Sequence, residues 1–127
     1  MAKILFIDDD ELTLTILTKA VEIHGHQAVH ARTGGEARQA VLKHSPDLVF
    51  VDMLLADMNG LEVVTGLHSD TATASVPIVM LSAGQELDAA ERARSAGAVA
   101  YLRKPVMMQT LLETIQRYAS NPGEAQA

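Results

Sequence analysis

The sequence predicts an α/β fold in which a doubly wound, parallel five-stranded sheet is covered by helices on both faces. Short apolar runs without alternation, typical of strands buried on both faces, lie at residues 4–7, 48–51, 78–81 and 99–102. Segments of helical periodicity separate these runs, and parallel strands require such crossover helices, which right-handed connections distribute over both faces. A chain of 127 residues has room for one such sheet but not for two.

The edges of the sheet follow from the polarity of the strands. A fifth, partly polar strand is predicted at residues 27–31, and its polarity places it at an edge beside the first strand. The run at residues 99–102 contains Tyr101 and only two strongly aliphatic residues, which favours the opposite edge.

Five helices are predicted from apolar spacing and from capping residues. In the first, at residues 11–24, one side is expected to carry Leu12, Ile16, Leu17, Ala20, Val21 and His24. Gly25 follows where a left-handed cap is expected, and Thr33 with Glu36 predicts a capping box for a helix that runs to about residue 43. The other helices are expected at residues 61–67 (carrying Leu61, Val64 and Leu67), 86–96 (closed by Gly97) and 107–119. Residues 1–119 then form the domain, and residues 120–127 a flexible tail or linker stub.

Composition narrows the functional classes. Apolar residues make up 48% of the chain and aromatic residues 3%, so the core must be aliphatic. A net charge of −6, with four consecutive acidic residues at 8–11, disfavours direct binding to nucleic acid and favours a cation. Cysteine is absent, which excludes disulfides and thiolate metal sites. No signal peptide or bilayer-length run is visible, so we expect a cytoplasmic protein that does not contact the membrane.

Polar residues follow the predicted strands where each strand ends. Asp8 and Asp9 follow the first run, Asp52 the third strand, Ser82 the fourth, and Lys104 the fifth. Ligands of such sheets bind at the carboxyl ends of the strands. Carboxylates so close together are unfavourable unless a cation intervenes, and Mg²⁺ is a hard ion that takes oxygen ligands and shares them with phosphate. Asp52 is then the expected nucleophile for an acyl phosphate, with Lys104 and Ser82 holding the phosphoryl group.

This ordered set resembles the receiver domain of two-component response regulators, over nearly all of residues 3–119. The residues that carry the resemblance are Asp8-Asp9, the phosphoacceptor Asp52, Met58-Asn59-Gly60, Ser82 with Ala83, the aromatic Tyr101, and Lys104-Pro105. The resemblance implies a flavodoxin-like fold with strand order 2-1-3-4-5.

The resemblance also implies a mechanism. A sensor histidine kinase or a histidine phosphotransfer protein would phosphorylate Asp52, with Mg²⁺ held by Asp9, Asp52 and the backbone carbonyl of Leu54, while Asp8 acts through water. Ser82 and Tyr101 would form the switch that remodels the face of the fourth helix, fifth strand and fifth helix. Such a chain is a signalling phosphoacceptor that catalyses its own phosphorylation and dephosphorylation, and not an enzyme with a separate substrate. The implied readout is a downstream protein or an output domain, in a monomer or a phosphorylation-linked dimer, and the bond before Pro105 is expected to be cis.

The chain departs from the family pattern in three places. Leu55 and Ala56 stand where methionine and proline are usual, which predicts a less rigid loop after Asp52 because proline fixes φ. Leu54 and Gly84 replace residues that are often polar. Asp10 makes the register of the acidic pair ambiguous, and we assign the pair to the two residues directly after the apolar run.

Two other functions compete. A haloacid dehalogenase-like phosphatase would use Asp8 and Asp10 as an Asp-x-Asp motif, but Glu11-Leu12 follows in place of the usual Gly-Thr, and no acidic pair follows Lys104. The second is an interaction module that is never phosphorylated. Every residue needed for phosphoryl transfer is present, and such a module would not need them.

Overall fold

A computed structural model describes residues 1–84 and 88–119 and shows one parallel sheet. Its strands run in the order β2-β1-β3-β4-β5, which confirms the predicted fold class, the strand order and both edges. The strands are β1 (Lys3–Ile7), β2 (Gln27–Ala31), β3 (Leu48–Asp52), β4 (Ile78–Ser82) and β5 (Ala100–Arg103).

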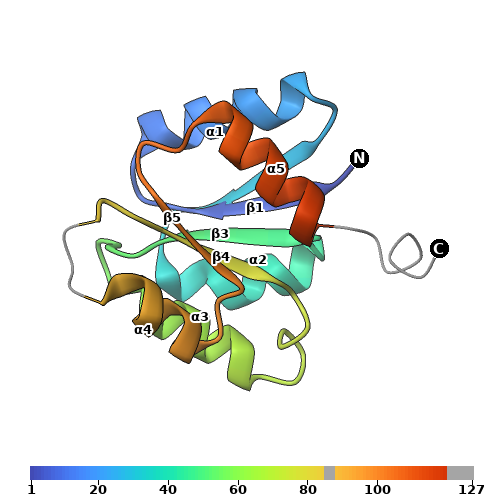
Figure 1. Cartoon of the computed structure of the whole chain (residues 1–127). Coiled ribbons are helices and arrows are strands. Elements are labelled where there is room, and N and C mark those ends of the chain that lie inside the picture. Colours follow the sequence, from blue (N-terminus) through green and yellow to red (C-terminus); the bar gives the residue numbers. More distant parts are fainter. Residues whose placement is uncertain (85–87, 120–127) are drawn as a thin grey trace.

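Helices cover both faces of the sheet (Figure 1). One face carries α1 (Glu11–Ile23) and α5 (Met108–Tyr118), and the other carries α2 (Ala37–His44), α3 (Gly60–Ser69) and α4 (Ala89–Ala96). A short 3-10 turn, η1 (Gly34–Glu36), precedes α2. Residues 86 and 87 of the predicted fourth helix, and the predicted tail at residues 120–127, lie outside the described residues. Within the described residues, no helix has the length and apolar character needed to cross a membrane.

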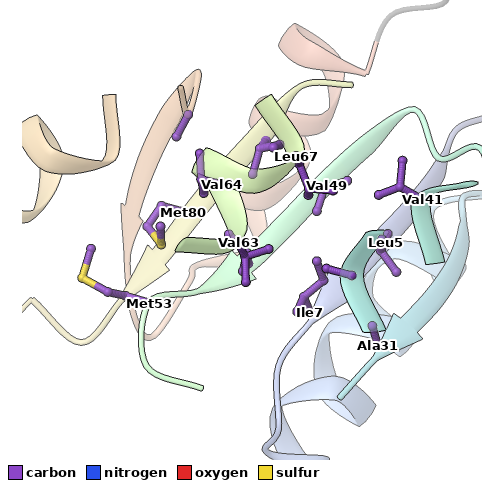
Figure 2. Packing of buried hydrophobic residues seen from close by; sticks show 14 of the residues in the cluster. Leu5, Ile7, Ala31, Val41, Val49, Met53, Val63, Val64, Leu67 and Met80 are labelled. Atoms are coloured by element: carbon purple, nitrogen blue, oxygen red, sulfur yellow. The ribbon is translucent and has the colours of Figure 1, made fainter. Parts of the chain in front are cut away.

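Alternation along the strands divides the interior into two cores. The α1/α5 core contains Phe6 and Phe50, whose rings stack at a centroid distance of 5.4 Å across neighbouring strands. The α2–α4 core contains the intervening strand residues and the inner side chains of α3, as Figure 2 shows for Val63, Val64 and Leu67 over β3 and β4. Burying each large aliphatic side chain contributes about 1.5–3 kcal/mol, so these two layers hold the strands in register.

The inner faces of two helices differ from the prediction. In α1 the buried stripe runs through Leu14, Leu17 and Val21, spaced by three and four residues, which leaves Leu12 and Ile16 67% and 58% exposed. The predicted side was therefore partly wrong, because apolar residues occur around most of this helix. In α3 the buried set is Val63, Val64 and Leu67, and Leu61 lies only partly buried at its margin.

The predicted caps are confirmed where the chain reverses. Gly25 and Gly97 have φ values of +86° and +120°, the left-handed region that favours glycine. Thr33 accepts the N–H of Glu36, but this cap begins the 3-10 turn that precedes α2 and not the α-helix directly.

Gly60 marks a close approach of two backbones that the fold requires. A Cβ added there would lie 2.2 Å from the carbonyl oxygen of Asp52, whereas a Cβ on Gly66 of the same helix meets nothing within 4 Å. We expect Gly60→Ala to lower the free energy of unfolding by about 1–3 kcal/mol through overpacking. Gly66→Ala should raise it by about 0.5–1 kcal/mol through helix propensity. Urea unfolding of both variants measures the difference, and equal effects would contradict the prediction.

Candidate functional site

Strand alternation brings three charged side chains to one side of the sheet. Asp8, Asp52 and Lys104 each lie two positions beyond a strand residue that packs in or against the α1/α5 core. Because successive side chains of a strand point to opposite faces, the three continue along the same face at the carboxyl edge. These three members of the predicted strand-end cluster therefore lie together on one side of the sheet.

Lys104 joins two of the carboxylates. Its Nζ lies 3.0 Å from Asp8 Oδ2 and 3.3 Å from Asp52 Oδ2, and the side chains of these two aspartates are only 2% and 14% exposed. The backbone N–H of Lys104 donates to the carbonyl of Ser82, and the bond to Pro105 is cis, as expected. The other oxygen of Asp8 accepts the N–H of Asp10. Sequence reasoning had placed Lys104 beside Asp52 but had missed its bond to Asp8.

Burial and neighbouring charges act in opposite directions on the pKa values of Asp52 and Lys104. Burial raises the pKa of Asp52 above its ordinary value, although the charge of Lys104 opposes the shift. Burial alone would lower the pKa of Lys104, but its hydrogen bond to Asp8 and the charges of Asp52 and Asp8 outweigh this and raise it. Lys104 is therefore a permanent cation beside a carboxylate that is only partly solvated.

Three carboxylates form a cluster suited to a hard cation. Oxygens of Asp8, Asp9 and Asp52 all lie within 4.8 Å of one another. Asp8 is buried and Asp9 is exposed, so the outer side of the cluster is open to water. Oxygen ligands with room for several waters are the arrangement that Mg²⁺ prefers, and the donor set therefore fits this ion.

Asp10 does not belong to this cluster. Its carboxylate caps α1 by accepting the N–H of Thr13 at 3.0 Å. Hydrogen bonds to Thr13 lower the pKa of Asp10, so it stays ionised as a cap. The ambiguity in the acidic run is resolved by geometry, since Asp8 and Asp9 lie with Asp52.

The loop after β3 surrounds Asp52. The backbone amide of Leu54 acts to lower the pKa of Asp52, against the larger effect of burial, and Leu54 pairs with Asn59 in an isolated bridge. The side chain of Leu54 is 59% exposed, so this residue can act on the site through its backbone. The predicted role of its carbonyl as a metal ligand stays a prediction.

Ser82 and Tyr101 lie on the other side of the sheet. Both continue the alternation of the α2–α4 core, and Tyr101 pairs in register with Met80, two residues before Ser82. Ser82 is buried and its Oγ accepts the N–H of Gly84 at 3.0 Å, while Tyr101 is half-buried. The hydroxyl and the aromatic ring are thus diagonal neighbours on one face of adjacent strands.

Known proteins share this fold, with sequence identities of 28–30%. Residues 4–116 match the family model described as the response regulator receiver domain. The polar-differentiation response regulator DivK of Brucella ovis is 30% identical over 115 residues, which cover 91% of this chain and 94% of that protein. A structure of a putative response regulator from Chloroflexus aurantiacus is 28% identical, with a TM-score of 0.88 over 94% of this chain and 98% of that one. The Vibrio cholerae chemotaxis protein CheY4 is also 28% identical, with a TM-score of 0.85 over 93% and 98%.

The ion pair between Lys104 and Asp8 can be measured with a double-mutant cycle. Lys104→Met leaves a buried carboxylate without its cation, and should lower the free energy of unfolding by about 1–3 kcal/mol in EDTA. In an Asp8→Asn background the same substitution should cost less, with a coupling energy of about 0.5–3 kcal/mol. Urea unfolding provides the values. Lys43→Met, on the exposed end of α2, is the matched control and should change stability by at most about 0.5 kcal/mol. A coupling energy of zero would contradict the ion pair.

Proposed function

The chain belongs to the response regulator receiver domain family of two-component systems, and from this premise we propose that Asp52 accepts a phosphoryl group from a histidine kinase or a histidine phosphotransfer protein. The observation that supports the proposal best is the position of the Asp52 carboxylate, which lies beside the ammonium of Lys104 and close to two further carboxylates at the strand edge. A nucleophile, a fixed cation and a metal-binding set are the parts that phosphoryl transfer requires.

In the proposed reaction an oxygen of Asp52 forms a bond to phosphorus while the bond from phosphorus to the donor's imidazole nitrogen breaks. Lys104 stabilises the negative charge of the phosphoryl oxygens, and Asp8 holds the ammonium in place. Bound by Asp9, Asp52 and the Leu54 carbonyl, Mg²⁺ would neutralise the charge that two anions bring together. Each carboxylate oxygen of Asp8 already accepts a hydrogen bond, one from Lys104 and one from the N–H of Asp10, which supports a role in which Asp8 acts on the ion through water. Later attack by water on phosphorus would break its bond to the Asp52 oxygen, which releases inorganic phosphate and restores the carboxylate.

The donor protein has to contact the surface around Asp52. An open cavity of about 340 Å³ lies beside Lys104 and is lined by Thr13, Ile16, Leu17, Leu81, Lys104, Pro105 and Val106. Ile16 in this lining is exposed, and so are Leu12 and Met107, which directly precede Thr13 and follow Val106 in the sequence. A phosphodonor with an apolar surface around its histidine would bury these groups as it brings the imidazole to Asp52.

The competing phosphatase is not supported by the structure. Its second aspartate would be Asp10, which here accepts hydrogen bonds from Thr13 as the cap of α1. In such a phosphatase the second aspartate would have to give a proton to the leaving group, and a carboxylate held as a helix cap is not free to reach it.

Phosphorylation of Asp52 is testable with a small phosphodonor. The parent should become labelled by acetyl phosphate in Mg²⁺, because the donor set and Lys104 are in place. Asp52→Asn should abolish labelling, since an amide is not a nucleophile of this kind. Lability of the label to alkali and hydroxylamine identifies an acyl phosphate, and mass spectrometry reports its position. Labelling that persists on Asp8, Asp9 or Asp10 would show the assignment to be wrong.

Metal dependence supplies the control. Asp9→Ala and addition of EDTA should each reduce labelling strongly, because both remove the cation from the site. Asp10→Ala is the matched control, since it should lower stability through the lost cap yet keep labelling. Equal labelling of Asp9→Ala and the parent would contradict the metal site.

We infer that Ser82 and Tyr101 carry the signal. When Asp52 gains a phosphoryl group, the hydroxyl of Ser82 can leave the N–H of Gly84 for the new oxygens. The half-buried ring of Tyr101, its diagonal neighbour, can then move inward and change the surface of α4, β5 and α5. The phosphoryl group shifts this equilibrium by its differential interaction with the two states.

The switch predicts a dependence on the hydroxyl of Ser82. Beryllofluoride bound at Asp52 should move the amide NMR shifts of α4 and β5 in the parent, and much less in Ser82→Ala. Occupancy is verified by fluorine NMR in both proteins. Unchanged shifts in the occupied parent would place the output surface elsewhere.

A further inference from the structure

The loop between β3 and α3 is fastened to a distant turn. Asp57 in this loop accepts two backbone N–H groups of η1, from Gly34 to Oδ1 at 2.9 Å and from Gly35 to Oδ2 at 3.0 Å. Asp57 lies 23 positions after Gly34 and 22 positions after Gly35 in the sequence. Each carboxylate oxygen satisfies one donor that a helix start otherwise leaves without a partner.

An apolar contact accompanies this carboxylate. A Cβ added at Gly34 would lie 2.5 Å from Cγ and Sδ of Met58, so Met58 packs directly against the backbone of η1. A Cβ on Gly35 would meet only ordinary contacts, 3.6 Å from Asp57 Oδ2. We call the contacts of Asp57 and Met58 with residues 34 and 35 the Asp57 clasp.

Internal hydrogen bonds connect the clasp to the site. Leu55 donates its N–H to the carbonyl of Met58 at 3.1 Å, and Leu54 pairs with Asn59 across the loop. Gly60 donates to the carbonyl of Met53 at 2.6 Å, beside Asp52. Because these bonds close the loop on itself, fixing one side at Asp57 restricts the backbone at Leu54 on the other.

We propose that Asp57 is a positioning residue of the phosphorylation site, whose carboxylate fastens the loop to η1 and thereby holds the backbone of Leu54 where the metal requires it. The inference rests on the proposed function, in which the Leu54 carbonyl is a ligand of Mg²⁺. It gives the loop a restraint that Leu55 and Ala56 do not supply. The two N–H donors also lower the pKa of Asp57, so the clasp stays ionised at neutral pH.

Two substitutions disturb the clasp in different ways. Asp57→Asn leaves one acceptor oxygen for two N–H donors, and its NH₂ group faces the second donor. Gly34→Ala keeps every charge but displaces Met58. Glu62→Gln, which removes one exposed charge from the first turn of α3, is the control for the first variant, and Gly35→Ala is the control for the second.

Calorimetric titration with Mg²⁺ separates positioning from stability. Asp57→Asn should raise the dissociation constant for Mg²⁺ about tenfold, the low end of effects seen for groups that orient metal ligands. Gly34→Ala should raise it in the same direction, and both controls should leave it unchanged. Melting temperatures in EDTA are measured alongside. Lower melting temperatures with an unchanged dissociation constant in both clasp variants would assign a purely structural role and overturn the proposal.

Hydrogen exchange tests the mechanical link without metal. The amides of Leu55 and Gly60 should exchange faster in Asp57→Asn than in the parent and in Glu62→Gln. Unchanged exchange at both amides would overturn the clasp whatever the metal data show.

Failure of the proposed function gives a different result. If Asp9→Ala binds Mg²⁺ as tightly as the parent does, the proposed metal site is wrong, and the positioning role of Asp57 is wrong with it even where exchange is faster. Normal Mg²⁺ binding by the parent with no effect of Asp57→Asn removes this inference alone.

Discussion

The parallel register of the strands is the constraint on which the rest of the molecule depends. Asp52 lies opposite Leu81, and Ser82 opposite Arg103, so each polar residue reaches the edge at the same level of the sheet. A slip of one residue would turn the Asp52 carboxylate from the face of Lys104 into the α2–α4 core. The two apolar cores prevent such a slip, since it would also expose the buried layers on both faces. The chemistry at the edge is therefore specified by side chains that take no part in it.

The carboxyl edge of the sheet carries more negative than positive charge. Three carboxylates share one short region with Lys104, whose ammonium contacts two of them. Partial burial strengthens both the attraction to Lys104 and the repulsion among the carboxylates, because the surroundings screen charge less than water does. The remaining negative charge favours a divalent cation, and the same charge would oppose an incoming phosphoryl group without one. The same excess of negative charge thus lowers the stability of the metal-free protein and raises its affinity for the ion.

The residues proposed for phosphorylation and those proposed for the switch come from opposite faces of the sheet. The α1 side supplies Asp8, Asp52 and Lys104, together with the exposed apolar groups of α1 that suit a phosphodonor. The opposite side supplies Ser82 and Tyr101, and Tyr101 packs against the core that includes residues of α4. A phosphoryl group on Asp52 would lie between these sides at the edge. The proposed output surface also includes α5, which packs on the α1 side, so the switch reaches both faces of the sheet.

Much of this could be read from the chain because apolar runs and strand-end residues are local properties. Four buried runs and one polar strand predicted the α/β class and both edges, and strand ends predicted the grouping of Asp8, Asp9, Asp52 and Lys104. The order 2-1-3-4-5 came from the family resemblance. Helix α1 could not be oriented, because its apolar residues surround most of the helix and only packing decided that Leu12 and Ile16 face outward. The bond from Lys104 to Asp8 and the clasp of Asp57 on residues 34 and 35 join positions far apart in sequence. Their geometry depends on where loops return to the sheet, and that is decided by tertiary packing, since no local pattern encodes it.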